Sequence, residues 1–115
     1  MGRGWLGLAA LLGLVCVAMG AFAAHGVSGA RAQDLLRTGA LYGFVHVLAA
    51  FAAGGKSRFA PPLFIAGVAV FSGTLWAMAL GGPRALGAVT PLGGLAFMAG
   101  WLALAWSQLG TRRRP

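Results

Sequence analysis

The sequence predicts an all-α membrane protein: a four-transmembrane-helix bundle with a short interfacial helix between the first and second spans. The few charges are clustered and leave four charge-free stretches, at residues 4–30, 38–55, 59–83 and 85–111. A mostly apolar, uncharged stretch of about 18 or more residues is typical of a membrane-spanning helix. Strands of a membrane barrel would alternate apolar and polar residues instead. Because these stretches fill nearly the whole 115-residue chain, we expect one four-span membrane domain over residues 1–115.

The first predicted span covers residues 5–24. About 20 helical residues rise roughly 30 Å, which matches the hydrocarbon core of a bilayer. The start of the chain has the three parts of a secretory signal peptide: a basic residue (Arg3), an apolar run, and small residues around Phe22. The run is longer than the roughly 7–15 apolar residues of a signal peptide, so we expect a permanent span.

The segment after the first span predicts a short helix that lies in the membrane interface. Residues 25–29 interrupt the first helix, and Ser28 is a candidate N-cap for a helix ending at Arg37. Val27 and the leucines at 35 and 36 would face lipid, while charged and amide side chains face water.

The remaining spans are expected at residues 38–54, 61–80 and 90–109. Pro61 and Pro62 suit the first turn of a helix, where a backbone donor is unpaired anyway. Gly-Gly-Pro at 81–83 ends the third span, and Thr90 before Pro91 predicts the N-cap of the fourth. Residues 111–115 form a basic tail.

The basic residues predict the orientation and the lipid partners. Four spans place both termini on the same side as the loop at Lys56. That side carries Arg3, Lys56, Arg58, Arg112, Arg113 and Arg114, whereas the other carries Arg31, Arg37 and Arg84. We therefore expect cytoplasmic N- and C-termini in a bacterial inner membrane, and contact with anionic lipid headgroups. Nucleic acid is not an expected partner, because the positive charge lies at the ends of the spans. Trp5, Trp101 and Trp106 are expected in outer turns, as interfacial anchors.

Small residues predict where the helices approach one another, because close backbone contact holds helices together in lipid. The candidate packing positions are Gly39, Gly43, Gly73, Gly93, Gly94 and Gly100. In so glycine-rich a chain, packing inside one bundle is favoured over a dedicated dimer motif. A homo-oligomer or a membrane-protein partner remains open.

Polar residues within the spans are the candidate functional residues. Thr38, Tyr42 and His46 are spaced i, i+4, i+8 and share one helix face. An ionisable group inside a membrane is a functional hypothesis by default, as a proton relay or a ligand. The alternative is a neutral imidazole hydrogen-bonded to Ser72 or to a backbone carbonyl. The candidate polar pocket comprises His25, Thr38, Tyr42, His46, Ser72 and Thr90.

The missing residue types argue against an enzyme and against bound cofactors. The chain has one acidic residue, Asp34, and neither Glu nor Asn. No span holds a carboxylate for proton-coupled export, and no nucleophile–base pair is evident. The two histidines lack nearby cysteines or carboxylates that would complete a metal site. A haem ligand at His46 has no supporting motif.

Four motifs in order resemble a family of small membrane proteins of unknown function. They are residues 20–26 (GAFAAHG), 38–46 (TGALYGFVH), 71–76 (FSGTLW) and 90–101 (TPLGGLAFMAGW). The sequence is similar to the YgdD-like and YwdK-like bacterial proteins and to the eukaryotic transmembrane protein 256. It departs from their pattern at Ala23, where they usually have Gly, and at Gly43, where they usually have Gln. The resemblance implies four spans in a bacterial inner membrane and no established reaction.

Two functional hypotheses follow. The first is a non-enzymatic accessory or scaffold protein, which predicts a closely packed interior with His46 satisfied inside the protein. The alternative is a small transporter or a proton or lipid carrier. It predicts a cavity between the second and third spans, lined by Tyr42 and His46.

Overall fold

Four long helices make up nearly all of the computed structural model, which describes residues 4–111. The elements are α1 (Gly4–His25), α2 (Ala30–Ala53), α3 (Ala60–Ala79), the 3₁₀ helix η1 (Arg84–Ala88) and α4 (Thr90–Thr111). By length and composition, all four long helices are able to cross a membrane. Every regular element of the described residues is helical, which confirms the predicted fold class.

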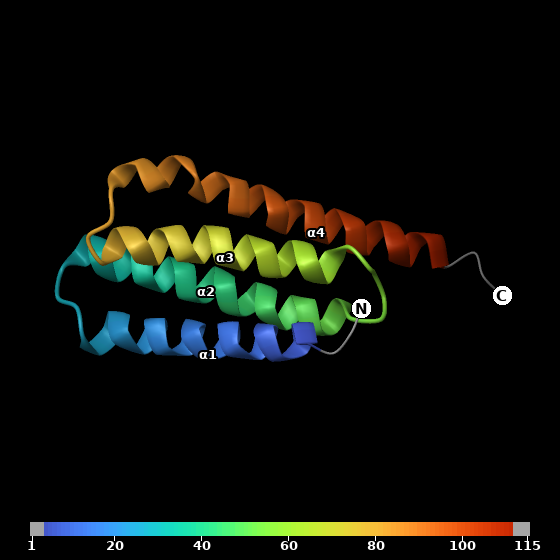
Figure 1. Cartoon of the computed structure of the whole chain (residues 1–115), viewed down its shortest axis with the longest axis horizontal. Coiled ribbons are helices and arrows are strands. Elements are labelled where there is room, and N and C mark those ends of the chain that lie inside the picture. The colour runs from blue at the N-terminus through green and yellow to red at the C-terminus, as the bar shows by residue number, and fades with distance from the viewer. Residues whose placement is uncertain (1–3, 112–115) are drawn as a thin grey trace.

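Successive helices run antiparallel and pack mainly against their neighbours in the chain (Figure 1). α1 packs on α2, α2 on α3, and α3 on α4, whereas α1 and α3 touch at few points. The start of α1, the connection from α2 to α3 and the end of α4 lie together at one end of the bundle (Figure 1). We call this the Lys56 end. The opposite end, with the α1–α2 connection and η1, is the Asp34 end.

The predicted interfacial helix is not present, and this part of the prediction is wrong. Residues 30–37 form the first turns of α2, which continues without a break to Ala53. Gly29 is the N-cap and no side chain caps the helix, so the expected cap by Ser28 is also wrong. Leu36 is fully buried, and its carbonyl oxygen accepts a 3.3 Å hydrogen bond from the indole nitrogen of Trp76. These contacts with α3 hold the segment on the bundle rather than in the interface.

The connections follow the turn residues of the sequence. Gly55 and Gly81 have φ angles of +82° and +104°, which side chains other than glycine rarely adopt. Pro61 and Pro62 occupy the first turn of α3. Thr90 is itself the first residue of α4, and its hydroxyl donates to the Leu86 carbonyl at 3.2 Å. The prediction that Thr90 caps the helix from outside is therefore wrong.

Small residues line the contact between α1 and α2. The buried residues of α1 are Ala9, Gly13, Cys16 and Ala23. Their spacing keeps them on one face of the helix. Because these side chains are small, the two backbones approach closely. In lipid the hydrophobic effect does not hold helices together, so this close packing stabilises the pair instead.

Two of the glycines on α2 make room for side chains of neighbouring helices. A Cβ added at Gly39 would lie 2.6 Å from the indole nitrogen of Trp76. A Cβ at Gly43 would lie 2.7 Å from the sulfur of Cys16 and 2.8 Å from the hydroxyl of Ser72. Gly43 is therefore the point where α1 and α3 both press against α2.

Two of the glycines on α4 make room for α3. Gly93 faces the backbone of Phe71, where an added Cβ would be 2.8 Å from the Phe71 Cα. At Gly100 an added Cβ would meet the Phe64 ring at 2.6 Å. No atom lies within 4 Å of a Cβ placed at Gly73 or Gly94, so these two glycines make no such contact.

Candidate functional site: an aromatic box around His46

His46 lies on α2 inside a box of aromatic rings from α3 and α4. Its side chain is 6% exposed. The imidazole stacks on Phe97 with ring centroids 3.6 Å apart and planes 8° apart. Phe64 lies at 5.6 Å, and Trp101 presents its edge at 5.9 Å. The box thus joins three helices through one polar ring.

Both ring nitrogens of His46 are hydrogen-bonded within the protein. Nδ1 lies 2.7 Å from the carbonyl oxygen of Tyr42, which only accepts, so Nδ1 carries the proton. Nε2 accepts a 3.1 Å hydrogen bond from the indole N–H of Trp101. One neutral tautomer satisfies both contacts. A second proton, on Nε2, would point at the indole N–H of Trp101, so the charged imidazolium does not fit these contacts. Because Nδ1 is protonated and the Nε2 lone pair accepts from Trp101, neither nitrogen has a free lone pair for a metal or haem.

Trp101 is the partner that the sequence analysis missed. It lies midway along α4, so its predicted place in an outer turn is wrong. Its ring is 45% exposed on the outer surface of the bundle, while its N–H points inward to His46. An indole N–H without a hydrogen-bond partner costs free energy in hydrocarbon, so the bond to His46 stabilises the position of Trp101. The available signal was the i, i+4 spacing of Phe97 and Trp101 on one helix face.

Two further polar contacts hold the helices together. The buried hydroxyl of Ser72 donates to the Gly39 carbonyl at 2.6 Å, whereas the hydrogen-bond partners of His46 are Tyr42 and Trp101. The hydroxyls of Thr74 and Thr90 lie 2.5 Å apart and connect α3 with α4. Hydrogen bonds between membrane helices contribute about 0.6 kcal/mol each on average.

The other candidate residues lie apart from the box. Tyr42 is 47% exposed, and its ring packs at a tilt on Phe71, 5.3 Å between centroids. Thr38 and His25 are exposed. The structure therefore distributes the six candidate residues over separate contacts and the surface, instead of around one cavity.

Two pockets among the described residues lie away from His46. One, of about 780 Å³, is at the Lys56 end, and a smaller one, of about 270 Å³, adjoins it. Neither is lined by Tyr42 or His46. Among residues 4–111, no group of three or more His, Cys, Asp or Glu side chains is placed to hold a metal ion.

Comparison with known proteins finds relatives over nearly the whole chain. Residues 19–94 match the family described as "Protein of unknown function (DUF423)". A UPF0382 membrane protein of Haemophilus influenzae is 35% identical, covering 94% of this chain and 95% of that protein. One from Schizosaccharomyces pombe is 39% identical, covering 84% of this chain and 94% of that protein. The UPF0382 inner membrane protein YgdD of Escherichia coli K12 is 35% identical, covering 92% and 89%. No solved structure matches the chain.

Proposed function

The chain belongs to the DUF423 family of membrane proteins of unknown function, and we propose that it is a non-enzymatic accessory or scaffold protein of the bacterial cytoplasmic membrane. The closed surroundings of His46 support this role. An ionisable residue within a span usually serves transport or catalysis. Here its two nitrogens are used by Tyr42 and Trp101, and its ring is enclosed by phenylalanines. His46 therefore holds α2 and α4 together through its hydrogen bond with Trp101 and its stacking on Phe97.

The composition supports a role without chemistry. Catalysis requires a positioned nucleophile, acid or base beside a substrate cavity. The only acidic side chain is that of Asp34 on an exposed turn of α2, and the only thiol, Cys16, is buried against Gly43. Neither residue lines either of the pockets at the Lys56 end.

Purified protein in liposomes is expected to conduct no protons. Vesicles containing a pH-sensitive dye should respond to an external pH step at the rate of empty vesicles, because no free imidazole nitrogen lies on a path across the bundle. His46→Leu should leave this rate unchanged and lower the thermal unfolding temperature in detergent. Proton entry above the rate of empty vesicles, abolished by His46→Gln with unfolding temperature unaltered, would instead establish a carrier.

Both termini are expected in the cytoplasm. The two termini and the α2–α3 connection together contain six basic residues, whereas the segments at the Asp34 end contain three. Basic residues are enriched on the cytoplasmic side of a membrane. A C-terminal fusion to alkaline phosphatase should be inactive and one to green fluorescent protein should be fluorescent. The matched control is a phosphatase fusion truncated after Arg84, which should be active because it ends on the other side. The reverse pattern of phosphatase activity would contradict the proposed orientation.

A further inference from the structure

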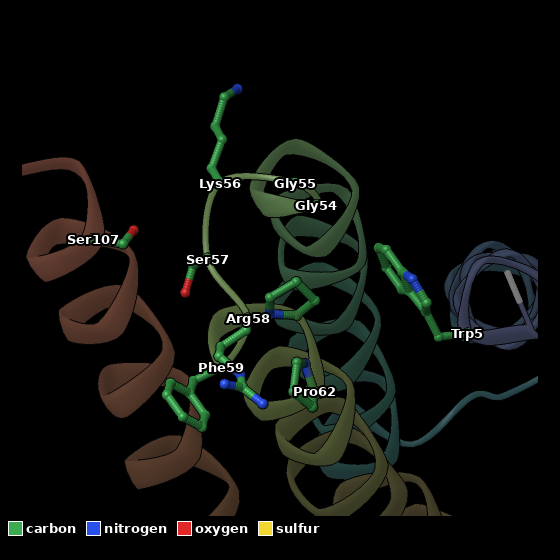
Figure 2. Close-up of a pocket in the computed structure, with 10 residues that line it drawn as sticks. Trp5, Gly54, Gly55, Lys56, Ser57, Arg58, Phe59, Pro62 and Ser107 are labelled. Carbon is green, nitrogen blue, oxygen red and sulfur yellow. The ribbon is translucent and has the colours of Figure 1, made fainter. Parts of the chain in front are cut away.

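The larger pocket opens at the Lys56 end, between the α2–α3 connection and the neighbouring helix ends. Figure 2 shows Trp5 of α1 on one side of the connection and Ser107 of α4 on the other. The lining residues are Trp5, Gly54, Gly55, Lys56, Ser57, Arg58, Phe59, Pro61, Pro62 and Ser107. The Lys56 side chain extends outward, while Arg58 turns back along Phe59 and Pro62 (Figure 2).

Within residues 4–111, the two cations of this pocket have no acidic partner. The only acidic side chain of the chain, Asp34, is on the first turns of α2, at the opposite end. Lys56 Nζ donates to the Ala52 carbonyl at 3.2 Å, and the Arg58 guanidinium lies 5.3 Å from the centroid of the Phe59 ring. These contacts hold the cations without neutralising them. The pocket therefore carries positive charge that attracts an anion.

An apolar groove continues from this pocket between α1 and α3. The smaller pocket shares Trp5, Pro61 and Pro62 with the larger one. It is otherwise lined by Leu8, Ile65, Ala66 and Ala69. The groove exists because α1 and α3 have few contacts with each other. From Pro61 to Ala69 it follows α3 for about 12 Å, close to the roughly 15 Å depth of one leaflet.

We propose that these two pockets form one site for a phospholipid with an anionic headgroup. Arg58 and Lys56 bind the phosphate at the membrane surface, and one acyl chain lies in the groove along Ile65 and Ala69. Trp5 lies at the boundary between the two parts, where its amphipathic ring suits the headgroup level. The positively charged pocket matches the anionic headgroup of a lipid, and the apolar groove that continues from it matches an acyl chain.

Other occupants fit less well. A free anion would leave the apolar groove unused. A second copy of the chain would bring the same two cations against Lys56 and Arg58. The terminal residues outside the described range carry arginines and no acidic side chain. A lipid satisfies both charge and shape.

Delipidated protein in detergent provides the test of the headgroup. Phosphatidylglycerol is expected to raise the unfolding temperature, and phosphatidylcholine to raise it much less. The K56Q/R58Q variant should bind phosphatidylglycerol about 30-fold more weakly, because each surface cation contributes about five-fold. R31Q/R37Q, at the Asp34 end, is the matched control and should retain the affinity. Equal stabilisation by both lipids, or an unaltered affinity in K56Q/R58Q, would overturn the proposal.

The groove is tested by filling it. Ala66→Phe should weaken phosphatidylglycerol binding by about ten-fold or more, because excluding about two methylene groups has this effect. Ala18→Phe, on an exposed face of α1 outside both pockets, is the control and should bind normally. Native mass spectrometry should count one bound phosphatidylglycerol per chain. Protection by glycerol phosphate as strong as by the lipid, or normal binding by Ala66→Phe, would show that the groove holds no acyl chain.

Discussion

Gly93→Ala is expected to destabilise the bundle by about 1–3 kcal/mol, which is the usual cost of overpacking a core. The added methyl group would meet the backbone of Phe71, including its Cα at 2.8 Å. Backbone atoms of a helix cannot turn aside as a flexible side chain does, so α3 and α4 must separate. The crossing includes Gly67, where an added Cβ would lie 3.0 Å from the Gly93 carbonyl oxygen. Thermal unfolding in detergent, followed by circular dichroism, measures the loss.

The neighbouring glycine supplies the control for this prediction. Gly94 has no atom within 4 Å of an added Cβ. Alanine is a better helix former than glycine by about 1 kcal/mol, so Gly94→Ala should be neutral or slightly stabilising. If both variants unfold at the temperature of the unmodified protein, the close crossing of α3 and α4 at Gly93 is incorrect.

Trp101→Phe is expected to cost about 1–3 kcal/mol, the penalty for leaving a buried acceptor without its donor. The change keeps an aromatic ring beside His46, but the ring is smaller and lacks the N–H from which His46 Nε2 accepts a hydrogen bond at 3.1 Å. His46 is 6% exposed, so water has little access to the acceptor that the change leaves unpaired. Denaturation in mixed micelles measures the change in unfolding free energy.

Two controls separate the hydrogen bond from the size of the side chain. Trp106→Phe makes the same change on the same helix, but Trp106 is 81% exposed, so little effect is expected. In a His46→Leu background, Trp101→Phe should cost much less than in the unmodified protein, because the acceptor is already gone. Equal costs in both backgrounds would mean that the pair does not stabilise the bundle.

The helices were predictable because each depends on composition over many residues. Long uncharged stretches placed all four spans, and the family resemblance is confirmed by relatives such as YgdD. The start of α2 was not predictable in the same way. Residues 30–37 carry the alternating polarity of an interfacial helix, but the burial of Leu36 and the bond from Trp76 keep them on the bundle. That contact joins residues 40 positions apart in the sequence.

The site was predictable only in part. His46 was identifiable as a polar residue in an apolar span, and the neutral imidazole bonded to a backbone carbonyl was one of the alternatives considered. The carbonyl is that of Tyr42. Trp101 was not identified as its partner, because sequence spacing relates residues of one helix and not of two. Likewise, the sequence does not show which glycines lie at a helix contact. Gly43, Gly73 and Gly94 were all candidates, and of these three only Gly43 contacts two other helices.

The sequence by itself determined that the chain is a four-helix membrane protein, because hydrocarbon admits long apolar helices and requires charges at their ends. The tertiary structure alone decided which polar groups meet. It directed the Trp101 N–H to His46, and it left the seam between α1 and α3 open beside Lys56 and Arg58. Such pairings depend on the rotation and register of whole helices, which small residues along several faces leave undetermined until the helices pack.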